Sequence, residues 1–166
     1  MGARDDAGLI RVLREHEVPH VLIGGWAVIT HGYVRFTRDI DVLIPDTDDA
    51  RERAALAMSS VHAHRYDGQL IGPESHMPEQ GWQLDTDIGR IDLLLEGAPP
   101  LDFAGVDASA IETKMDGVPL RVADLAHLVA FKRLADRPSD RIDLQELAAL
   151  HGGTLPQLDL PGLDGA

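Results

Sequence analysis

The chain has 166 residues, 44% of them hydrophobic, which fits one compact domain with a substantial core and makes two full domains improbable. It has no cysteine, so disulfides, thiolate zinc sites and cysteine nucleophiles are excluded. With 28 acidic against 15 basic residues the formal charge is −13, which disfavours an extended nucleic-acid surface but suits divalent cations or a basic partner or substrate.

The first half of the chain predicts alternating helices and strands. The stretch MGARDDAGLIRVLREHE is charged throughout, unlike a signal peptide, and no later stretch reaches about 18 uninterrupted apolar residues, so we expect a cytoplasmic protein without membrane contact. The predicted elements are a helix over 5–17, a strand over 20–23, a short helix over 26–31, a strand over 39–44 and a helix over 48–60.

The second half predicts hairpins followed by two helices. Residues 62–96 have the pattern of strands and turns, and WQLDTDIGRIDLLLE predicts a hairpin whose second arm covers 91–95. The Asp-Gly pair in TKMDGVPLRV predicts another hairpin. Two helices follow, over 124–136 and 139–150, separated by Pro138.

The predicted domain covers residues 1–151. Residues 152–166 are rich in glycine and proline and are expected to form a tail. Packing of this segment on the body through Leu155, Leu158 and Leu160 is the alternative.

Carboxylates alternate with apolar residues on the strand predicted over 39–44. Because successive side chains of a strand point to opposite faces, Asp39 and Asp41 share one face while Ile40 and Val42 face the core. Two adjacent carboxylates raise one another's pKa unless a cation lies between them, and Mg²⁺ prefers such oxygen ligands. The pattern therefore predicts a divalent metal site.

A third acid, Asp92, lies between Ile91 and Leu93 in the same kind of strand. If this strand pairs beside 39–44, Asp92 joins the same face, and three acids can hold two metal ions about 4 Å apart that activate an attacking oxygen and clamp a phosphate. Simpler interpretations are solvated or capping acids in the D-x-D and an ion pair between Asp92 and Arg90.

Gly24 and Gly25 lie where a strand turns into a helix. Glycine lets the backbone approach a ligand, and the free N–H groups at the start of a helix attract anions. A tight turn without a ligand is the alternative. Beside metal-binding acids, the pair predicts the site of a metal-bound triphosphate.

The string GGWAVITHGYVRFTRDIDVLI, with a later single Asp on another strand, resembles the signature of the nucleotidyltransferase superfamily with the DNA-polymerase-beta-like fold. Its G-G-x-A, H-G and R-x-T-x-D-I-D elements look like the small bacterial subgroup that includes the AbiEii toxin-type proteins. The resemblance extends over roughly residues 5–150. It implies an α+β fold, a mixed β-sheet flanked by helices, with a C-terminal helix pair.

The resemblance also implies an activity: transfer of a nucleoside monophosphate from an NTP to an acceptor, with release of pyrophosphate. Two Mg²⁺ ions, or Mn²⁺ as an alternative, would serve as cofactors. Asp39 and Asp41 would bind both metals, and Asp92 would bind the catalytic metal and help to deprotonate the acceptor hydroxyl. Gly24 and Gly25 would cradle the phosphates. Positioning and charge neutralisation would supply most of the acceleration.

Two basic residues are candidate nucleotide contacts. Lys132 lies in DLAHLVAFKRLADRPSDRIDLQEL, which resembles the family's C-terminal segment, where a helical lysine reaches the nucleotide. A lysine whose stem covers apolar surface while its charge reaches water is the alternative. Arg35 and Thr37 alternate with Asp39, so an early start of the strand would place Arg35 on the phosphates or the acceptor. Thr37 is then expected to be structural.

The remaining candidates are expected to be structural. Ion pairs of Arg137, Asp140 and Asp143 would tie the last two helices together, and His31 would pack or hydrogen-bond at a helix end. The expected exposed histidines, with a transition-metal site as the alternative, are His62, His64 and His76. Trp26 and Trp82 are expected in the core or a pocket wall.

The leading interpretation is thus a Mg²⁺-dependent nucleotidyltransferase of minimal size. Its acceptor is either a small molecule such as an aminoglycoside or lincosamide antibiotic, or a protein or RNA as in toxin–antitoxin systems. The negative charge would attract a polycation such as an aminoglycoside. The alternatives are a non-catalytic nucleotide-binding or protein-interaction module that retains the fold, and a metal-dependent phosphohydrolase using the same acids.

Overall fold

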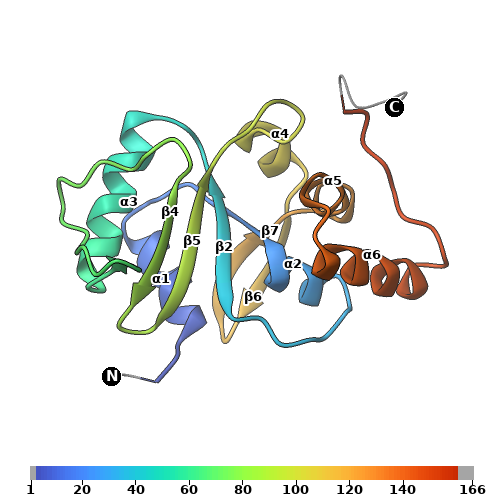
Figure 1. Cartoon of the computed structure of the whole chain (residues 1–166), viewed down its shortest axis with the longest axis horizontal. Coiled ribbons are helices and arrows are strands. Elements are labelled where there is room, and N and C mark those ends of the chain that lie inside the picture. The colour runs from blue at the N-terminus through green and yellow to red at the C-terminus, as the bar shows by residue number, and fades with distance from the viewer. Residues whose placement is uncertain (1–2, 161–166) are drawn as a thin grey trace.

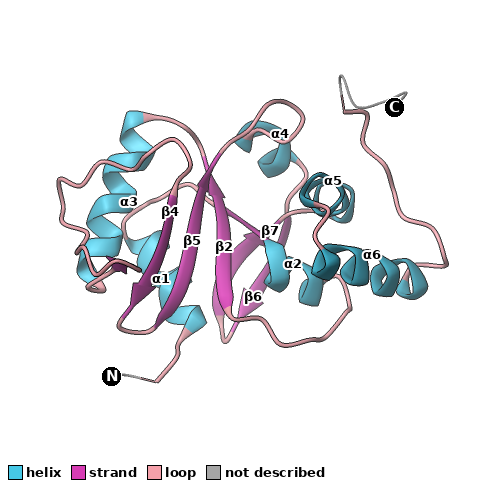
Figure 2. Ribbon diagram, viewed as in Figure 1, coloured by secondary structure: helices cyan, strands magenta, loops and turns pink. Residues whose placement is uncertain are grey.

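A computed structural model of the chain describes residues 3–160 and shows a seven-stranded mixed sheet with flanking helices (Figures 1 and 2). The strand order is β3-β4-β5-β2-β1-β7-β6. Strands β2 and β5 pair in parallel, as do β1 and β7, and the other neighbours are antiparallel. The strands are β1 (Val21–Ile23), β2 (Asp39–Ile44), β3 (His64–Arg65), β4 (Trp82–Thr86), β5 (Gly89–Leu95), β6 (Ile111–Met115) and β7 (Val118–Val122).

The helices flank this sheet, and their starts follow local capping chemistry. They are α1 (Asp6–Glu15), α2 (Gly24–Thr30), α3 (Asp48–Ser60), α4 (Phe103–Ala108), α5 (Leu125–Ala135) and α6 (Pro138–Leu150). Asp5, Thr47 and Asp124 cap α1, α3 and α5 by accepting hydrogen bonds from backbone N–H groups in the first turn. Such caps satisfy donors that a helix start leaves free.

Alternation along the central strands divides the two faces of the sheet. Ile40, Val42 and Ile44 of β2 belong to the main core, together with residues of α1 and α3. Leu43 faces the other way, into a smaller cluster that includes Val106 of α4 and, at its edge, Phe131 of α5. The acidic residues of β2 share this second face, which the main core does not cover.

Most predicted elements are confirmed, several of them with bounds shifted by one or two residues. The helix expected over 26–31 begins at Gly24, and the last helix includes Pro138. Proline is tolerated at the first helical position because the N–H that it lacks has no partner there. The short helix α4 has no counterpart in the prediction.

The described part of the C-terminal segment, residues 152–160, contacts the body. Leu155 packs against the main core, as the packing alternative requires, while Leu158 is partly exposed. The part of the predicted tail over 161–166 lies outside the described residues. In residues 3–160, no helix combines the length and apolar character needed to span a bilayer.

Candidate active site

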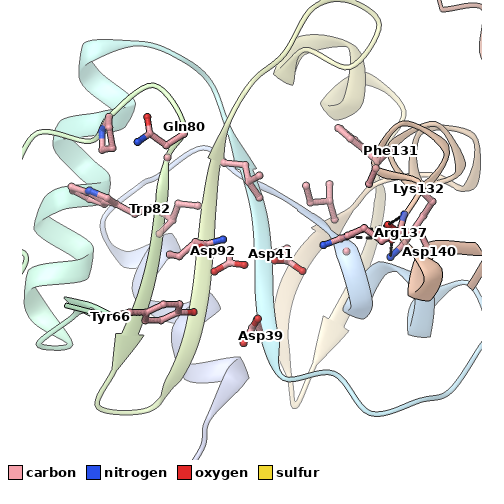
Figure 3. A pocket seen from close by; sticks show the side chains of 18 of the residues that line it. Asp39, Asp41, Tyr66, Gln80, Trp82, Asp92, Phe131, Lys132, Arg137 and Asp140 are labelled. Atoms are coloured by element: carbon pink, nitrogen blue, oxygen red, sulfur yellow. Dashed lines mark hydrogen bonds and ion pairs between the residues drawn. The ribbon is translucent and has the colours of Figure 1, made fainter. Parts of the chain in front are cut away.

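The sheet register brings together the three acids that the sequence analysis selected. Asp41 of β2 lies directly opposite Asp92 of β5, and Asp39 lies opposite Arg90. All three carboxylates line one cavity of about 740 Å³ (Figure 3). The suggested ion pair between Asp92 and Arg90 is replaced by another contact, because Arg90 donates to Asp85 at 2.8 Å.

Asp39, Asp41 and Asp92 form the acidic floor of the cavity, and two chemically different walls lie beside it (Figure 3). Helix α5 contributes Phe131 and Lys132 on one side, together with Arg137, which lies directly before α6. The turn after β3 and the segment leading into β4 contribute Tyr66 and Trp82, among others, on the opposite side. The expectation that Trp82 forms core or pocket wall is confirmed, since it is buried and lines the cavity.

The carboxyl groups of the floor are electrostatically strained in the metal-free protein. Burial is the main cause that raises the pKa of Asp92 to about 7, and the hydrogen bond and charge of Asp41 add to it. Burial and the charge of Asp39 also raise the pKa of Asp41, although Lys132 and Arg137 oppose the shift. The floor therefore holds a proton near neutral pH.

This strain predicts how stability depends on pH. An acid whose pKa is raised by folding binds its proton more tightly in the folded chain, so the free energy of unfolding falls as pH rises from about 4 to about 7. We expect the metal-free protein to lose roughly 2 kcal/mol between about pH 5 and about pH 8, after allowance for solvent screening. Urea unfolding in the presence of a chelator, repeated across this pH range, measures the loss. A free energy of unfolding that does not change with pH would contradict the raised pKa of Asp92.

The donor set fits a hard divalent cation. Oδ1 of Asp39 and Oδ1 of Asp92 are buried without a hydrogen-bond partner, and unpaired carboxylate oxygens are the ligands that Mg²⁺ prefers. Within residues 3–160, however, no three Asp, Glu or His side chains already converge on one ion position.

Neighbouring side chains lie so close to Gly24 and Gly25 that a side chain at either position would collide with them. Gly24 has φ +70°, and a Cβ there would lie 2.1 Å from Oδ2 of Asp41. A Cβ on Gly25 would lie 2.4 Å from Oγ1 of Thr37. Thr37 also donates to the carbonyl of Asp39 at 3.2 Å, so it packs the turn against the start of β2, which agrees with the expected structural role.

Gly24→Ala is expected to lower the rate of nucleotidyl transfer about a hundredfold, because the new methyl group displaces the Asp41 carboxylate. The initial rate of pyrophosphate release measures this effect. Gly117→Ala is the matched control, since Gly117 has a similar φ of +81° but nothing within 4 Å of its Cβ position. Equal rates in the two variants would show that Asp41 tolerates the displacement.

Lys132 reaches the cavity but is already held by two carboxylates. Its Nζ lies 2.9 Å from Asp140 and 2.9 Å from Asp143, and the residue is only 6% exposed. The alternative of a lysine whose charge reaches water is therefore wrong. Arg137 also donates to Asp140, at 2.7 Å, but this contact lies within the start of α6; the ion pairs that join the last two helices are those of Lys132 with Asp140 and Asp143.

Arg35 does not line the cavity, but its Nη1 would lie 3.3 Å from a Cβ on Gly25, so the guanidinium is next to the glycine pair and the expected nucleotide contact stays a prediction. Strand β2 begins at Asp39, so the early start that would have placed Arg35 on its acidic face does not occur. The guanidinium instead donates to both oxygens of Asp143, at 2.7 and 2.8 Å. Arg35 ties the loop before β2 to α6.

Two further structural expectations are met. His31 contacts the carbonyl of Ala123 through Nε2 at 2.8 Å, at the end of α2. The indole of Trp26 donates to Asp6 and packs at the edge of the main core. Among the described residues, no cluster includes the three histidines at 62, 64 and 76 as a metal site.

Tyr66 and Arg137 line the cavity, although neither was expected to be functional. The sequence Arg65-Tyr66-Asp67-Gly68 is a readable turn signal, since glycine and aspartate favour turns. Nothing in that signal shows which neighbour the turn faces. Arg137 carries a helix-capping pattern that points to a structural role alone.

Comparison with known proteins shows the fold. No protein-family model matches the chain, and no curated protein matches it. The crystal structure of ANT(2″)-Ia in complex with adenylyl-2″-tobramycin matches with TM-score 0.59 and 17% identity, over 87% of this chain and 86% of that chain. The solution structure of antibiotic-resistance factor ANT(2″)-Ia matches with TM-score 0.59 and 18% identity, over 87% of this chain and 80% of that chain. The chain has the nucleotidyltransferase fold, α+β with a mixed sheet.

Proposed function

We propose that the protein is a Mg²⁺-dependent nucleotidyltransferase that moves a nucleoside monophosphate from an NTP to a hydroxyl group. The observation that carries this proposal is the acidic floor: Asp41 faces Asp92 in register, and buried oxygens of Asp39 and Asp92 are unpartnered. The nucleotidyltransferase fold supports it. A closer relation to the AbiEii-type subgroup rests on the sequence string alone and belongs to the same proposal.

Each part of the site has a role in the proposed reaction. The acceptor oxygen forms a bond to the α-phosphorus while the bond to the bridging oxygen breaks, and pyrophosphate leaves. Asp92, which lies opposite Asp41 in register, would take the acceptor's proton. Asp39, Asp41 and Asp92 would hold the divalent ions, which neutralise the phosphate charge when bound.

The nucleotide is assigned to the side of the acidic floor on which the glycine pair and the cationic side chains of the cavity lie. We assign the triphosphate to Gly24 and Gly25, beside Lys132 and Arg137. Because Asp140 and Asp143 already compensate Lys132, the guanidinium of Arg137 contributes the more available charge: its side chain is 69% exposed and pairs with one carboxylate. Arg35 is left out of this assignment.

For the acceptor we propose a cationic, hydroxyl-bearing small molecule of the aminoglycoside kind, modified in the cytoplasm. The net charge of −13 favours approach of a polycation. The neighbour ANT(2″)-Ia is bound to adenylyl-2″-tobramycin, which makes this acceptor class the first to examine.

A labelled-nucleotide screen tests the proposed function. The protein is incubated with Mg²⁺ and each of the four NTPs labelled at the α-phosphate, with tobramycin, a lincosamide, bulk tRNA or a candidate protein partner. Pyrophosphate release with label on an acceptor supports a transferase and identifies the acceptor. Phosphate release alone indicates a hydrolase, and nucleotide binding without turnover indicates a non-catalytic module; either result overturns the proposal.

A further inference from the structure

The turn after β3 fixes an exposed aromatic ring at the edge of the cavity. The backbone N–H of Gly68 donates to the carbonyl of Arg65 at 2.8 Å, and that of Arg65 donates to the carbonyl of Gln69 at 2.9 Å. Oδ1 of Asp67 accepts from Gln69 N at 3.0 Å. Tyr66 lies at the second position of this turn, so its backbone is held on both sides although the residue is 56% exposed.

The Tyr66 ring lies over the polar face of the sheet. The guanidinium carbon of Arg90 is 5.5 Å from the ring centroid, and Asp85 holds Arg90 from the neighbouring strand. A cation over the ring is a favourable contact that fixes its orientation. Arg90 is also opposite Asp39 in register, so the same contact places Tyr66 next to the acidic floor.

One side of the ring remains available to a ligand. Arg90 covers one face, and the exposed remainder of Tyr66 lines the cavity. Figure 3 shows the hydroxyl directed toward the side on which Asp92 and Asp39 lie.

Charge separates the two walls of the cavity. The wall made by Lys132 and Arg137 lies across the acids from Tyr66 (Figure 3). Anionic phosphates are favoured where the exposed guanidinium of Arg137 lies near the backbone of Gly24, which leaves the Tyr66 wall, where Arg65 also lines the cavity, for the molecule that attacks. Its polar neighbours Gln80 and Gln83 offer amide groups that can bond hydroxyls.

We propose that Tyr66 is a specificity-determining residue whose ring positions the acceptor beside Asp92. A sugar or cyclitol ring presents C–H groups to an aromatic face and hydroxyls to the surrounding amides, so such a ring can lie on Tyr66 with a hydroxyl toward the acids. The inference rests on the proposed transferase function and deepens it, because it assigns the acceptor to one wall.

Binding measurements on the loaded protein test this assignment separately from turnover. Calorimetry gives the affinity of wild type, Tyr66→Ala and Tyr66→Phe for α,β-methylene-ATP with Mg²⁺, and then the affinity of each loaded protein for tobramycin. We expect Tyr66→Ala to weaken tobramycin binding about tenfold and Tyr66→Phe to change it less than about twofold. The affinity for α,β-methylene-ATP is expected to stay unchanged in both variants.

Leu70→Ala provides a matched control. Leu70 is 68% exposed on the same loop but does not line the cavity, so its truncation should leave both affinities unchanged. Thermal unfolding of each variant checks that the loss of an exposed side chain has not unfolded the protein.

Three outcomes would overturn the inference. Equal tobramycin affinity in Tyr66→Ala and wild type would remove the ring from acceptor binding, and a tenfold loss of α,β-methylene-ATP affinity would place it on the nucleotide instead. Failure of loaded wild type to bind tobramycin would reject the acceptor assigned to this wall. The proposed transferase itself fails only on separate results: no binding of the α,β-methylene analogue of any of the four NTPs, or no labelled acceptor in the screen.

Discussion

Asp92→Asn is expected to lower nucleotidyl transfer by a factor on the order of 10³. Asparagine keeps the size of the side chain but removes one of the carboxylates proposed to bind the metal and accept the acceptor's proton. Nothing else in the floor replaces it, because Asp41 and Asp39 have metal-binding roles of their own in the proposed reaction. The initial rate of pyrophosphate release at saturating ATP and Mg²⁺ measures the loss.

Asp87→Asn serves as the control for this substitution. Asp87 belongs to the turn between β4 and β5, its side chain is 57% exposed, and it contacts His62 outside the cavity. The same chemical change there should leave the rate within about twofold of wild type. An Asp92→Asn enzyme as active as Asp87→Asn would remove Asp92 from the mechanism.

The acidic floor shows what a local pattern can predict. The alternation of Asp39 and Asp41 with apolar residues was sufficient to place both acids on one face, because the period of a strand is two. The position of Asp92 beside them depends on parallel pairing of β2 with β5, across about fifty residues of chain. Periodicity leaves that pairing open, and it was the resemblance to a known signature that implied it.

Arg35 and Tyr66 show where local reasoning failed. Arg35 has the right spacing to continue the acidic face, but an ion pair with Asp143, 108 residues away in sequence, holds it elsewhere. Tyr66 lies in a readable turn, yet its position over Arg90 follows from the order β3-β4-β5. In both cases a contact between distant segments determines the direction of the side chain.

Lys132 combines both situations, because its helix was predictable and its partners were not. It lies between Asp140 and Asp143, whose side chains are 1% and 2% exposed. Burial alone would raise the pKa of Asp140, but hydrogen bonds from Arg137 and Lys132 lower it to about 2. The Asp140 carboxylate is therefore charged at neutral pH and depends on its cations.

Lys132→Met is expected to destabilise the protein by about 3 kcal/mol, since it leaves two buried carboxylates with one cation fewer. Arg137 and Arg35 remain as partners, which keeps the loss at the lower end for a broken buried pair. Urea unfolding at neutral pH measures the effect. Arg141→Met is the control, because Arg141 of α6 forms an exposed ion pair with Asp136 at the end of α5, and its loss should cost under about 1 kcal/mol.

A double variant distinguishes lost charge compensation from lost packing. Adding Asp140→Asn to Lys132→Met removes one of the uncompensated carboxylates, so it should restore about 1 kcal/mol or more of the lost stability. If Lys132→Met unfolds at the same urea concentration as Arg141→Met, the ion pairs do not hold α5 to α6. The charge of Lys132 would then be available to the nucleotide, as the sequence first suggested.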